Sequence, residues 1–242
     1  MGRVLLSGGC LGMKAPSTEI SAGTLAVGTV VKVPVNGVVI EFIVVHQGKP
    51  GSMYDESCNG TWLLMEDCYE KRQWNSSSNS NDYAASTIHS YLNGAFLNLF
   101  EANIKAAIKQ VKIPYRPGAG YGQNVNTGAS GLSAKIFLLS AKETSFNFNY
   151  MPPGEGVELA YFKGCADGSA DNKRVAKLDG SAMNWWLRTP YCNSSLSTEF
   201  PLYVQYDGSF SISYGEYAVR PALVLDSTAH FDGSTLVLKG VA

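Results

Sequence analysis

The residues from Tyr191 to Tyr217 have side chains suited to contacting a ligand rather than to acid–base or nucleophilic chemistry. The stretch contains five Tyr and six Ser but no Lys, Arg or Trp. Tyr supplies a large amphipathic surface with few rotatable bonds, and Ser supplies adaptable hydrogen bonds, so both are abundant in antibody loops. Its carboxylates and thiol are Glu199, Asp207, Glu216 and Cys192, a poor set for catalysis. The composition predicts a binding surface, with an ordinary Tyr-rich surface hairpin as the alternative.

The part of this stretch around Asp207 is predicted to form a hairpin with one apolar face and one polar face. A loop from Asp207 to Ser209 brings residues of one face together in the pairs Tyr206–Phe210, Val204–Ile212 and Leu202–Tyr214. The other face then presents four residues to solvent, namely Tyr203, Gln205, Ser211 and Ser213. A shorter turn at Asp207 and Gly208 would mix polar and apolar residues on both faces, so the longer loop is favoured.

Residues that could support catalysis or metal binding are scattered and lack the usual motifs. The chain has no Gly-x-Ser-x-Gly and no His-Glu-x-x-His, and its three His are His46, His89 and His230. The glycines between Arg116 and Gly131 lack a following Lys-Ser or Lys-Thr, so this loop is not a phosphate cradle. Five Cys without a Cys-x-x-Cys pair indicate reduced, mostly buried thiols at Cys10, Cys58, Cys68, Cys165 and Cys192. We therefore predict no catalytic residue, no metal and no cofactor.

The overall composition is that of a globular domain without an electrostatic preference for nucleic acid or membranes. A chain of 242 residues with 45% hydrophobic residues can bury the core of one domain, predicted over residues 27–242. Residues 1–26 are rich in Gly, Ser and Thr and are predicted to form an N-terminal arm. A net charge of -1 gives no basic patch. We find neither an apolar run long enough for a transmembrane helix nor a recognisable signal peptide, and we predict no membrane insertion.

Short strands and two helices are predicted from the hydrophobic pattern. Asn36 and Gly37 join two β-branched runs, Val27–Val33 and Val38–His46, into a tight hairpin. Further strands are expected at Thr61–Glu66, Lys135–Ser140 and Ser234–Lys239, and a short helix at Val157–Lys163.

Ser86 is predicted to cap the first helix, in which Ile88, Leu92, Phe96 and Leu99 recur at helical spacing. His89 in that helix is expected to be a surface or packing residue. A second helix follows from the spacing of Ile104, Ile108 and Val111. Short antiparallel strands, two helices and long irregular loops together predict an α+β domain.

Two motifs close to the Tyr- and Ser-rich stretch carry a resemblance to a known family. The segment 184–225 opens with NWWLRTP and closes with VRPALVL. It resembles the C-type-lectin-fold variable proteins of diversity-generating retroelements, in the group that shares a WWLRSP…VRPAL signature. The runs GTVVKVPVNGVVIEFIVV, STIHSYLNGAFLNLF and KIFLLSAKE extend the resemblance over about residues 27–225. Thr189 stands where the family often has Ser, and Glu216 stands beside a usual Asn or Gly.

The resemblance implies a C-type-lectin-like fold whose C-terminal segment is rewritten by adenine-directed mutagenesis of Asn codons. Such mutagenesis never produces Glu, Gln, Lys, Met or Trp, and only Glu199, Gln205 and Glu216 between residues 191 and 217 fall outside the accessible set. The implied scaffold residues are Trp185, Trp186, Leu187, Arg188, Arg220, Pro221, Leu223 and Leu225. The implied ligand contacts are Tyr191, Asn193, Ser194, Ser195, Ser197, Tyr203, Gln205, Ser211, Ser213 and Tyr217.

The resulting hypothesis is a non-enzymatic ligand-binding protein with a diversified surface. The first version is a phage tail receptor-binding protein, located in the virion, that recognises a protein or glycan on a host cell. Residues 1–26 would attach it to a tail partner or support a homo-oligomer. The alternative is an adhesin displayed on a bacterial surface. An oxidase related to the formylglycine-generating enzymes would need a reactive pair such as Cys165 and Cys192, and calcium-dependent sugar binding is disfavoured because the Glu-Pro-Asn and Gln-Pro-Asp tripeptides are absent.

Overall fold

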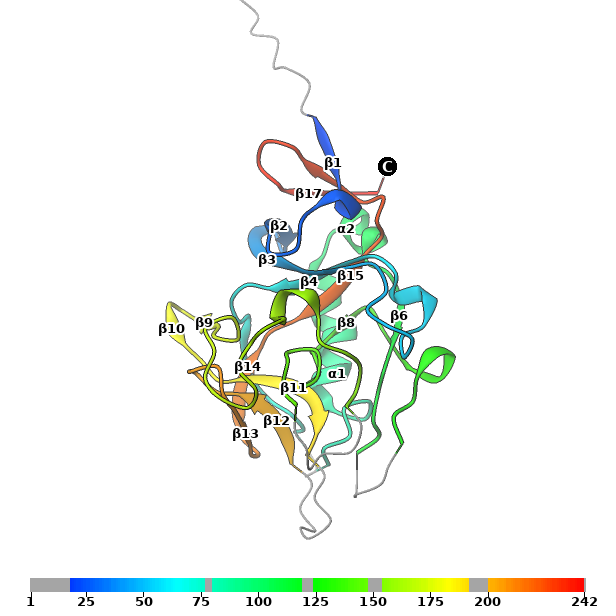
Figure 1. The fold of residues 1–242 in the computed structure, drawn as a ribbon. Helices are drawn as coiled ribbons and strands as arrows, with labels where there is room; N and C mark the ends of the chain where they lie inside the picture. The colour runs from blue at the N-terminus through cyan, green and yellow to red at the C-terminus, as the bar shows by residue number, and fades with distance from the viewer. Residues whose placement is uncertain (1–17, 77–79, 119–123, 148–153, 192–199, 242) are drawn as a thin grey trace, which may run out of the picture.

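The computed structural model describes residues 18–76, 80–118, 124–147, 154–191 and 200–241 (Figure 1). Strands account for 35% of the described residues and helices for 15%. The strands of the described residues form five sheets, two of which have five strands each. The domain is therefore mostly β, with its helical turns packed around the sheets.

The first large sheet is antiparallel and has the strand order β2-β3-β4-β15-β8. Its strands are β2 (Val30–Val35), β3 (Val38–Gln47), β4 (Thr61–Met65), β15 (Ala222–Leu225) and β8 (Ile136–Phe137). Every residue of β4 and β15 is buried. A continuous apolar run such as TWLLM is expected where both faces of a strand are covered. Here Leu63 belongs to one apolar core, and Trp62 and Leu64 belong to another on the opposite face.

The second large sheet has the strand order β13-β12-β11-β14-β5. Its strands are β13 (Phe210–Ile212), β12 (Pro201–Val204), β11 (Trp185–Pro190), β14 (Glu216–Val219) and β5 (Glu70–Gln73). Neighbouring strands are antiparallel except β11 and β14, which run parallel. Trp185 packs into a third core on one face, while Trp186 packs into the first core on the other. The two large sheets thus share the first core.

Three small sheets complete the domain. One joins β1 (Glu19–Ser21), β16 (His230–Asp232) and β17 (Leu238–Gly240), and the others pair β6 (Val111–Ile113) with β7 (Leu132–Ala134) and β9 (Lys177–Leu178) with β10 (Ser181–Ala182). Figure 1 shows β1 and β17 at one end of the molecule and β12 and β13 at the other. Part of the predicted N-terminal arm is therefore held against the domain, and Ala22, which follows β1, is completely buried. Residues 1–17 lie outside the described residues.

The helical segments are short, and the predicted α+β, C-type-lectin-like fold with two helices is wrong. Helix α1 (Thr87–Tyr91) begins as predicted at Ser86, whose Oγ accepts a hydrogen bond of 3.1 Å from the His89 amide. The chain continues through a π-helical turn (Leu92–Phe96) and a 3₁₀ turn (Leu97–Leu99). Helix α2 covers only Ala102–Ala107. The remaining 3₁₀ turns are Ala22–Thr24, Glu56–Cys58, Gly128–Ser130 and Ala160–Phe162.

The second predicted helix ends early because the backbone that follows it pairs with strand β15. The amide of Lys109 donates a hydrogen bond of 2.8 Å to the carbonyl of Val224 in β15, and Ile108 forms a bridge with Leu225. Val111, expected on the same helix, lies in β6. The expected helix at Val157–Lys163 is likewise reduced to a single 3₁₀ turn.

Two local predictions are confirmed. Asn36 and Gly37 have φ angles of 50° and 74° and join β2 to β3, with Val35 opposite Val38. Positive φ at both residues is what a two-residue hairpin turn requires. The strand predicted at Thr61–Glu66 is β4. The strands predicted at Lys135–Ser140 and Ser234–Lys239 are shorter or displaced, since the observed ones are β8 and β17.

A buried ion pair connects β11 to the chain that follows β8. Arg188 donates from Nη1 to Glu143 Oε2 at 2.6 Å and from Nη2 to Glu143 Oε1 at 2.7 Å, and both side chains are fully buried. Nη1 also donates to the carbonyl of Leu138 at 2.8 Å. The carboxylate accepts further bonds from the Tyr54 hydroxyl at 2.7 Å and the Ser140 amide at 2.9 Å. Each charge is therefore surrounded by partners, which a buried ion pair needs in order to stabilise a fold.

Arg188→Met should lower the free energy of unfolding by about 3–5 kcal/mol, because the Glu143 carboxylate would remain buried without its counter-ion. Chemical denaturation measures the loss. The matched control is Arg72→Met, which removes a partly exposed guanidinium paired with Glu70 and should cost less than about 1 kcal/mol. Equal losses for the two variants would contradict a special role for the buried pair.

Candidate functional site

Four aromatic side chains form a continuous group on one face of the second sheet. They are Trp74, Trp186, Tyr203 and Tyr217, here called the aromatic row. The centroid of the Trp186 ring lies 4.7 Å from that of Tyr217, 6.0 Å from that of Tyr203 and 5.5 Å from that of Trp74. The two phenol rings are 4.2 Å apart. The register explains this grouping, because Trp186 in β11 is directly opposite Tyr203 in β12, and Tyr217 lies on neighbouring β14.

Polar and charged groups border the aromatic row on both sides. Ser211 of β13 is opposite Tyr203, and Arg72 of β5 is opposite Tyr217. The guanidinium carbon of Arg72 lies 3.4 Å from the centroid of the Tyr91 ring, a cation–π arrangement. Burial raises the pKa of Tyr203, as does its hydrogen bond with Tyr217, while a hydrogen bond with Ser211 lowers it. The Tyr203 phenol therefore stays neutral near pH 7 and can donate or accept hydrogen bonds.

The predicted hairpin exists, but its register differs from the expected one by two residues. The observed pairs are Leu202–Ile212, Tyr203–Ser211 and Val204–Phe210. The amide of Gln205 donates to the carbonyl of Ser209 at 2.7 Å, so the loop consists of Tyr206, Asp207 and Gly208. A side chain at Gly208 would lie 2.1 Å from the carbonyl oxygen of Asp171, which explains the glycine. A shift of two residues preserves the faces, so Leu202, Val204, Phe210 and Ile212 pack inward as predicted. Tyr206, expected on the same face, is instead 62% exposed in the loop.

The polar face of the hairpin is less open than predicted. Tyr203 is 7% exposed because Trp186 and Tyr217 cover its ring. Gln205 uses its amide within the hairpin, donating to Ser209 Oγ at 2.7 Å and to the carbonyl of Phe210 at 3.1 Å. Ser211, Ser213 and Tyr217 are partly exposed. The expectation of a fully solvent-facing set is thus corrected for Tyr203, whose ring belongs to the core.

Four of the remaining predicted contacts lie in a stretch outside the described residues, and Tyr191 precedes that stretch. Asn193, Ser194, Ser195 and Ser197 lie in that stretch, so nothing is said of their placement. Its ends are close together, because the Tyr191 amide donates to the carbonyl of Phe200 at 2.7 Å. Asn81, which is fully buried, donates through Nδ2 to the carbonyl of Tyr191 at 3.1 Å. Sequence reasoning missed Asn81, since it lies in a polar Ser- and Asn-rich stretch that predicted only a loop.

Four of the implied scaffold residues, Trp185, Trp186, Arg188 and Arg220, fix both ends of the segment 184–225 through hydrogen bonds. The indole N–H of Trp185 donates to the carbonyl of Arg174 at 2.9 Å, and that of Trp186 to the carbonyl of Arg72 at 2.8 Å. Arg188 holds Glu143, as described above. Arg220 donates through Nε to the carbonyl of Met65 and through Nη2 to the carbonyl of Glu66, both at 2.8 Å. All four side chains are buried.

The cysteines that the structure describes are free thiols in environments that disfavour the thiolate. Burial raises the pKa of Cys58 and of Cys68 to about 12 and that of Cys165 to about 11. A reactive thiol needs the opposite, a lowered pKa in an electropositive setting. Cys10 and Cys192 lie outside the described residues. Within the described ranges no three His, Cys, Asp or Glu side chains are grouped to hold a metal ion.

His46 and His89 each contact a neighbouring element, and His89 is the packing residue that the sequence predicted. The Nδ1 of His46 accepts a hydrogen bond of 3.2 Å from the amide of Ala160, and the His89 ring lies 4.9 Å from that of Tyr83. Burial lowers the pKa of both imidazoles, so both are mainly neutral at pH 7. Across the part of the chain that is described, no helix is long and apolar enough to cross a membrane.

Comparison with known proteins identifies a family but no characterised relative. The family model described as "Domain of unknown function (DUF6273)" matches residues 59–227, which include the segment 184–225 and both large sheets except β2 and β3. No curated protein and no solved structure matches the chain.

Tyr203→Ala should lower the free energy of unfolding by about 3–5 kcal/mol, the usual cost of deleting a large aromatic side chain from a core. Tyr206→Ala is the matched control on the same hairpin, since Tyr206 is 62% exposed and should cost less than about 0.5 kcal/mol. Thermal and chemical denaturation of both variants test this. A stable Tyr203→Ala variant would mean that the ring does not support the sheet.

Cys58, Cys68 and Cys165 should resist alkylation by iodoacetamide at pH 8 in the folded protein. With a pKa of about 11, roughly one thiol in a thousand is ionised at that pH. Labelling should accelerate as the pH rises toward 11 and should be rapid at pH 8 in denaturant. Peptide mass spectrometry distinguishes these three sites from Cys10 and Cys192. Fast labelling of Cys165 in the folded protein would show that this thiol is reactive and would contradict the prediction.

Proposed function

This chain belongs to the DUF6273 family, and we propose that its domain is a non-enzymatic binding module that recognises a protein or glycan on a cell surface. The observation that carries the proposal is the group of partly exposed side chains Tyr217, Ser211 and Ser213, which lies against the three buried rings of the aromatic row. Aromatic rings next to hydroxyl groups supply both contact area and hydrogen bonds, and Tyr is enriched at binding interfaces for this reason.

The buried residues beneath this surface favour binding because they hold fixed positions in the absence of a ligand. Trp186 is fully buried and fixed by its hydrogen bond to Arg72, so the phenols that rest on it keep their positions without a ligand. Ordering a flexible surface costs free energy on association, and a rigid one avoids much of that cost. The bond between Tyr191 and Phe200 fixes the two residues on either side of positions 192–199. Ser211, Ser213 and Tyr217 can therefore be presented from a fixed base.

The composition of the segment supports a diversified surface. Between residues 191 and 217, Glu199, Gln205 and Glu216 are the residues that adenine randomisation of Asn codons cannot produce. Gln205 is bonded within the hairpin, a structural role that a fixed residue would have. We therefore favour a variable protein of a diversity-generating retroelement. Display on a phage tail that binds a host cell is the first version, and display as an adhesin on a bacterial surface is the second.

An oxidase is the competing class, and the thiol environments weigh against it. The raised pKa values of Cys58, Cys68 and Cys165 have burial as their main cause. A thiol used in catalysis is normally activated by a neighbouring cation or base. Arg174 and Lys173 lower the pKa of Cys165 less than burial raises it.

The double variant Ser211→Lys/Ser213→Lys should abolish binding to bacterial cells, because two cations would stand on a neutral contact surface. The probes are a panel of intact bacterial cells and a glycan array, with bound protein measured by fluorescence. Ser130→Lys is the matched control, an exposed Ser in the turn Gly128–Ser130. Circular dichroism confirms that all variants are folded.

If the double variant still binds and the Ser130 variant does not, the binding surface is not the one formed by Ser211, Ser213 and Tyr217. Sequencing the coding segment from many cells then separates a diversified surface from a fixed one. Substitutions confined to adenines of codons 191–217 support the retroelement. An invariant segment with no template copy near a reverse transcriptase gene contradicts it while leaving the binding surface intact.

A further inference from the structure

Strand β3 extends beyond its neighbour β4 and leaves part of one edge without a partner. The pairing of the two strands starts at Phe42 and Met65, and the amide of Glu66 adds one more bond, of 3.0 Å, to the carbonyl of Glu41. In an antiparallel ladder, successive residues direct their backbone N–H and C=O groups to opposite sides. The backbone groups of Val39 therefore point to the same side as those of Glu41, and they have no hydrogen-bond partner among the described residues.

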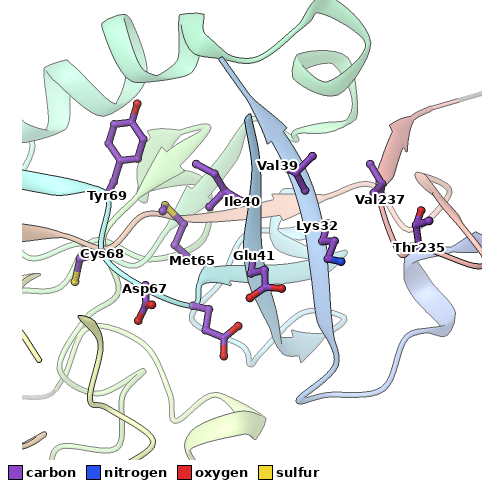
Figure 2. A pocket seen from close by; sticks show the side chains of 11 residues that line it. Lys32, Val39, Ile40, Glu41, Met65, Asp67, Cys68, Tyr69, Thr235 and Val237 are labelled. Carbon is purple, nitrogen blue, oxygen red and sulfur yellow. The ribbon is translucent and has the colours of Figure 1, made fainter. Parts of the chain in front are cut away.

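A groove of about 840 Å³ follows this unpaired edge, and its volume is within the range of ligand sites. Figure 2 shows the side chains of Ile40 and Met65 on the side where Tyr69 lies, and that of Val39 on the side of Val237. The chain leaves β3 after Met65 and continues to β5 in the second large sheet. The space that a longer β4 would occupy is therefore hollow, with apolar side chains on both of its sides.

The outer edge of the hairpin β2–β3 on the β2 side is covered, whereas the edge at Val39 is not. The amide of Lys32 in β2 donates to the carbonyl of Leu236 at 2.8 Å, and Lys32 also forms a parallel bridge with Val237. Val39 is 50% exposed. An exposed apolar strand edge is a template for pairing with another segment, and proteins usually cover such edges. The edge at Val39 is thus suited to an extended segment that adds one strand to the sheet.

Residues 1–17 of the same chain join the described part beside this groove. The amide of Gly233 donates to the carbonyl of Thr18 at 2.7 Å, and Thr235, two residues after Gly233, lines the groove. Two residues of chain span at most about 7 Å, whereas residues 7–17 could span up to about 36 Å when extended. The part of the chain that precedes residue 7 can therefore reach the whole groove.

The sequence of residues 3–6, Arg-Val-Leu-Leu, suits a strand on an apolar edge. Val4–Leu6 is the longest apolar run within residues 1–17. Alternate residues of a strand face the same side, so Val4 and Leu6 would contact the apolar side chains of the groove while the backbone pairs with Val39. Residues 1–17 contain no Asp or Glu, so they bring no negative charge to the carboxylates that line the groove.

We propose that residues 3–6 add a short strand to the free edge of β3 in their own chain, with residues 7–17 as the connection. The backbone of this strand bonds to Val39, and the side chains of Val4 and Leu6 fill the groove. A short flexible connection gives an effective concentration of about 1 mM, so a groove affinity of about 0.1 mM docks the strand in about nine molecules of ten. The docking does not depend on the binding function proposed above, and a partner strand can use the same edge only by displacing residues 3–6.

Amide hydrogen exchange of Val39, measured by NMR on the full chain, tests the docking. In the double variant Val4→Asp/Leu6→Asp, Val39 should exchange about tenfold faster than in the unaltered chain, because two carboxylates cannot enter the apolar groove. The matched control is Leu11→Asp/Met13→Asp, which makes the same change in the connection and should leave the exchange of Val39 unaltered. Circular dichroism confirms that both variants are folded.

Equal exchange of Val39 in the unaltered chain and in the first double variant would overturn the proposal. Equally fast exchange in both double variants would also overturn it, since the effect would then not belong to residues 3–6. Each measurement is made at low and at high protein concentration, with the mass determined by sedimentation. Slow exchange that is the same at both concentrations in a monomer supports docking within one chain. Slow exchange that appears only in a dimer at high concentration would assign the groove to residues 3–6 of a second copy and contradict the proposal.

Discussion

The ion pair between Arg188 and Glu143 is the constraint on which the rest of the structure depends. Two fully buried charges are tolerated here because each has several hydrogen-bond partners, including the hydroxyl of Tyr54. The space around that hydroxyl is narrow. A Cβ atom at Gly156, where φ is +102°, would lie 2.1 Å from the Tyr54 oxygen. Strand β11, which carries Arg188, also supplies Trp186 to the first core. The pair thus ties the second sheet to the loops beside the first one.

The segment 184–225 is anchored to the rest of the domain at its two ends, and the surface proposed for ligand binding lies in its middle. Its ends contain the buried strands β11 and β15, and Arg188 and Arg220 attach them to backbone and carboxylate groups from other elements. The middle contains the hairpin β12–β13, whose inner face packs into the third core and whose other face borders the aromatic row. Substitutions at partly exposed positions of the middle leave the buried contacts of the ends unchanged. A surface can change its residues freely only where those residues are not the ones whose buried contacts stabilise the fold.

Sequence patterns predicted the local elements whose causes are local. The turn at Asn36 and Gly37 follows from the φ angles that these residues accept, and the Ser86 cap follows from one side-chain oxygen. Interactions across the chain were not predictable in this way. Ile108 has helical spacing from Ile104, but its backbone pairs with Leu225 of β15 and leaves the helix. Alternation assigned Tyr203 to the correct face of its strand, yet nothing in that pattern reveals that the rings of Trp186 and Tyr217 cover it. Pairing of Arg188 with Glu143, 45 residues apart, is equally invisible to periodicity.

The small sheet β1-β16-β17 brings the two ends of the described chain to the same pole. Ser21 pairs with His230, and His230 pairs with Gly240, so the backbone enters and leaves the domain through neighbouring strands. The hairpin β12–β13 lies at the opposite pole (Figure 1). Strands β1 and β17, through which the described chain enters and leaves the domain, therefore lie at the pole away from this hairpin. The domain can be tethered to a larger assembly, an affinity tag or a sensor chip by one pole while the other still faces outward.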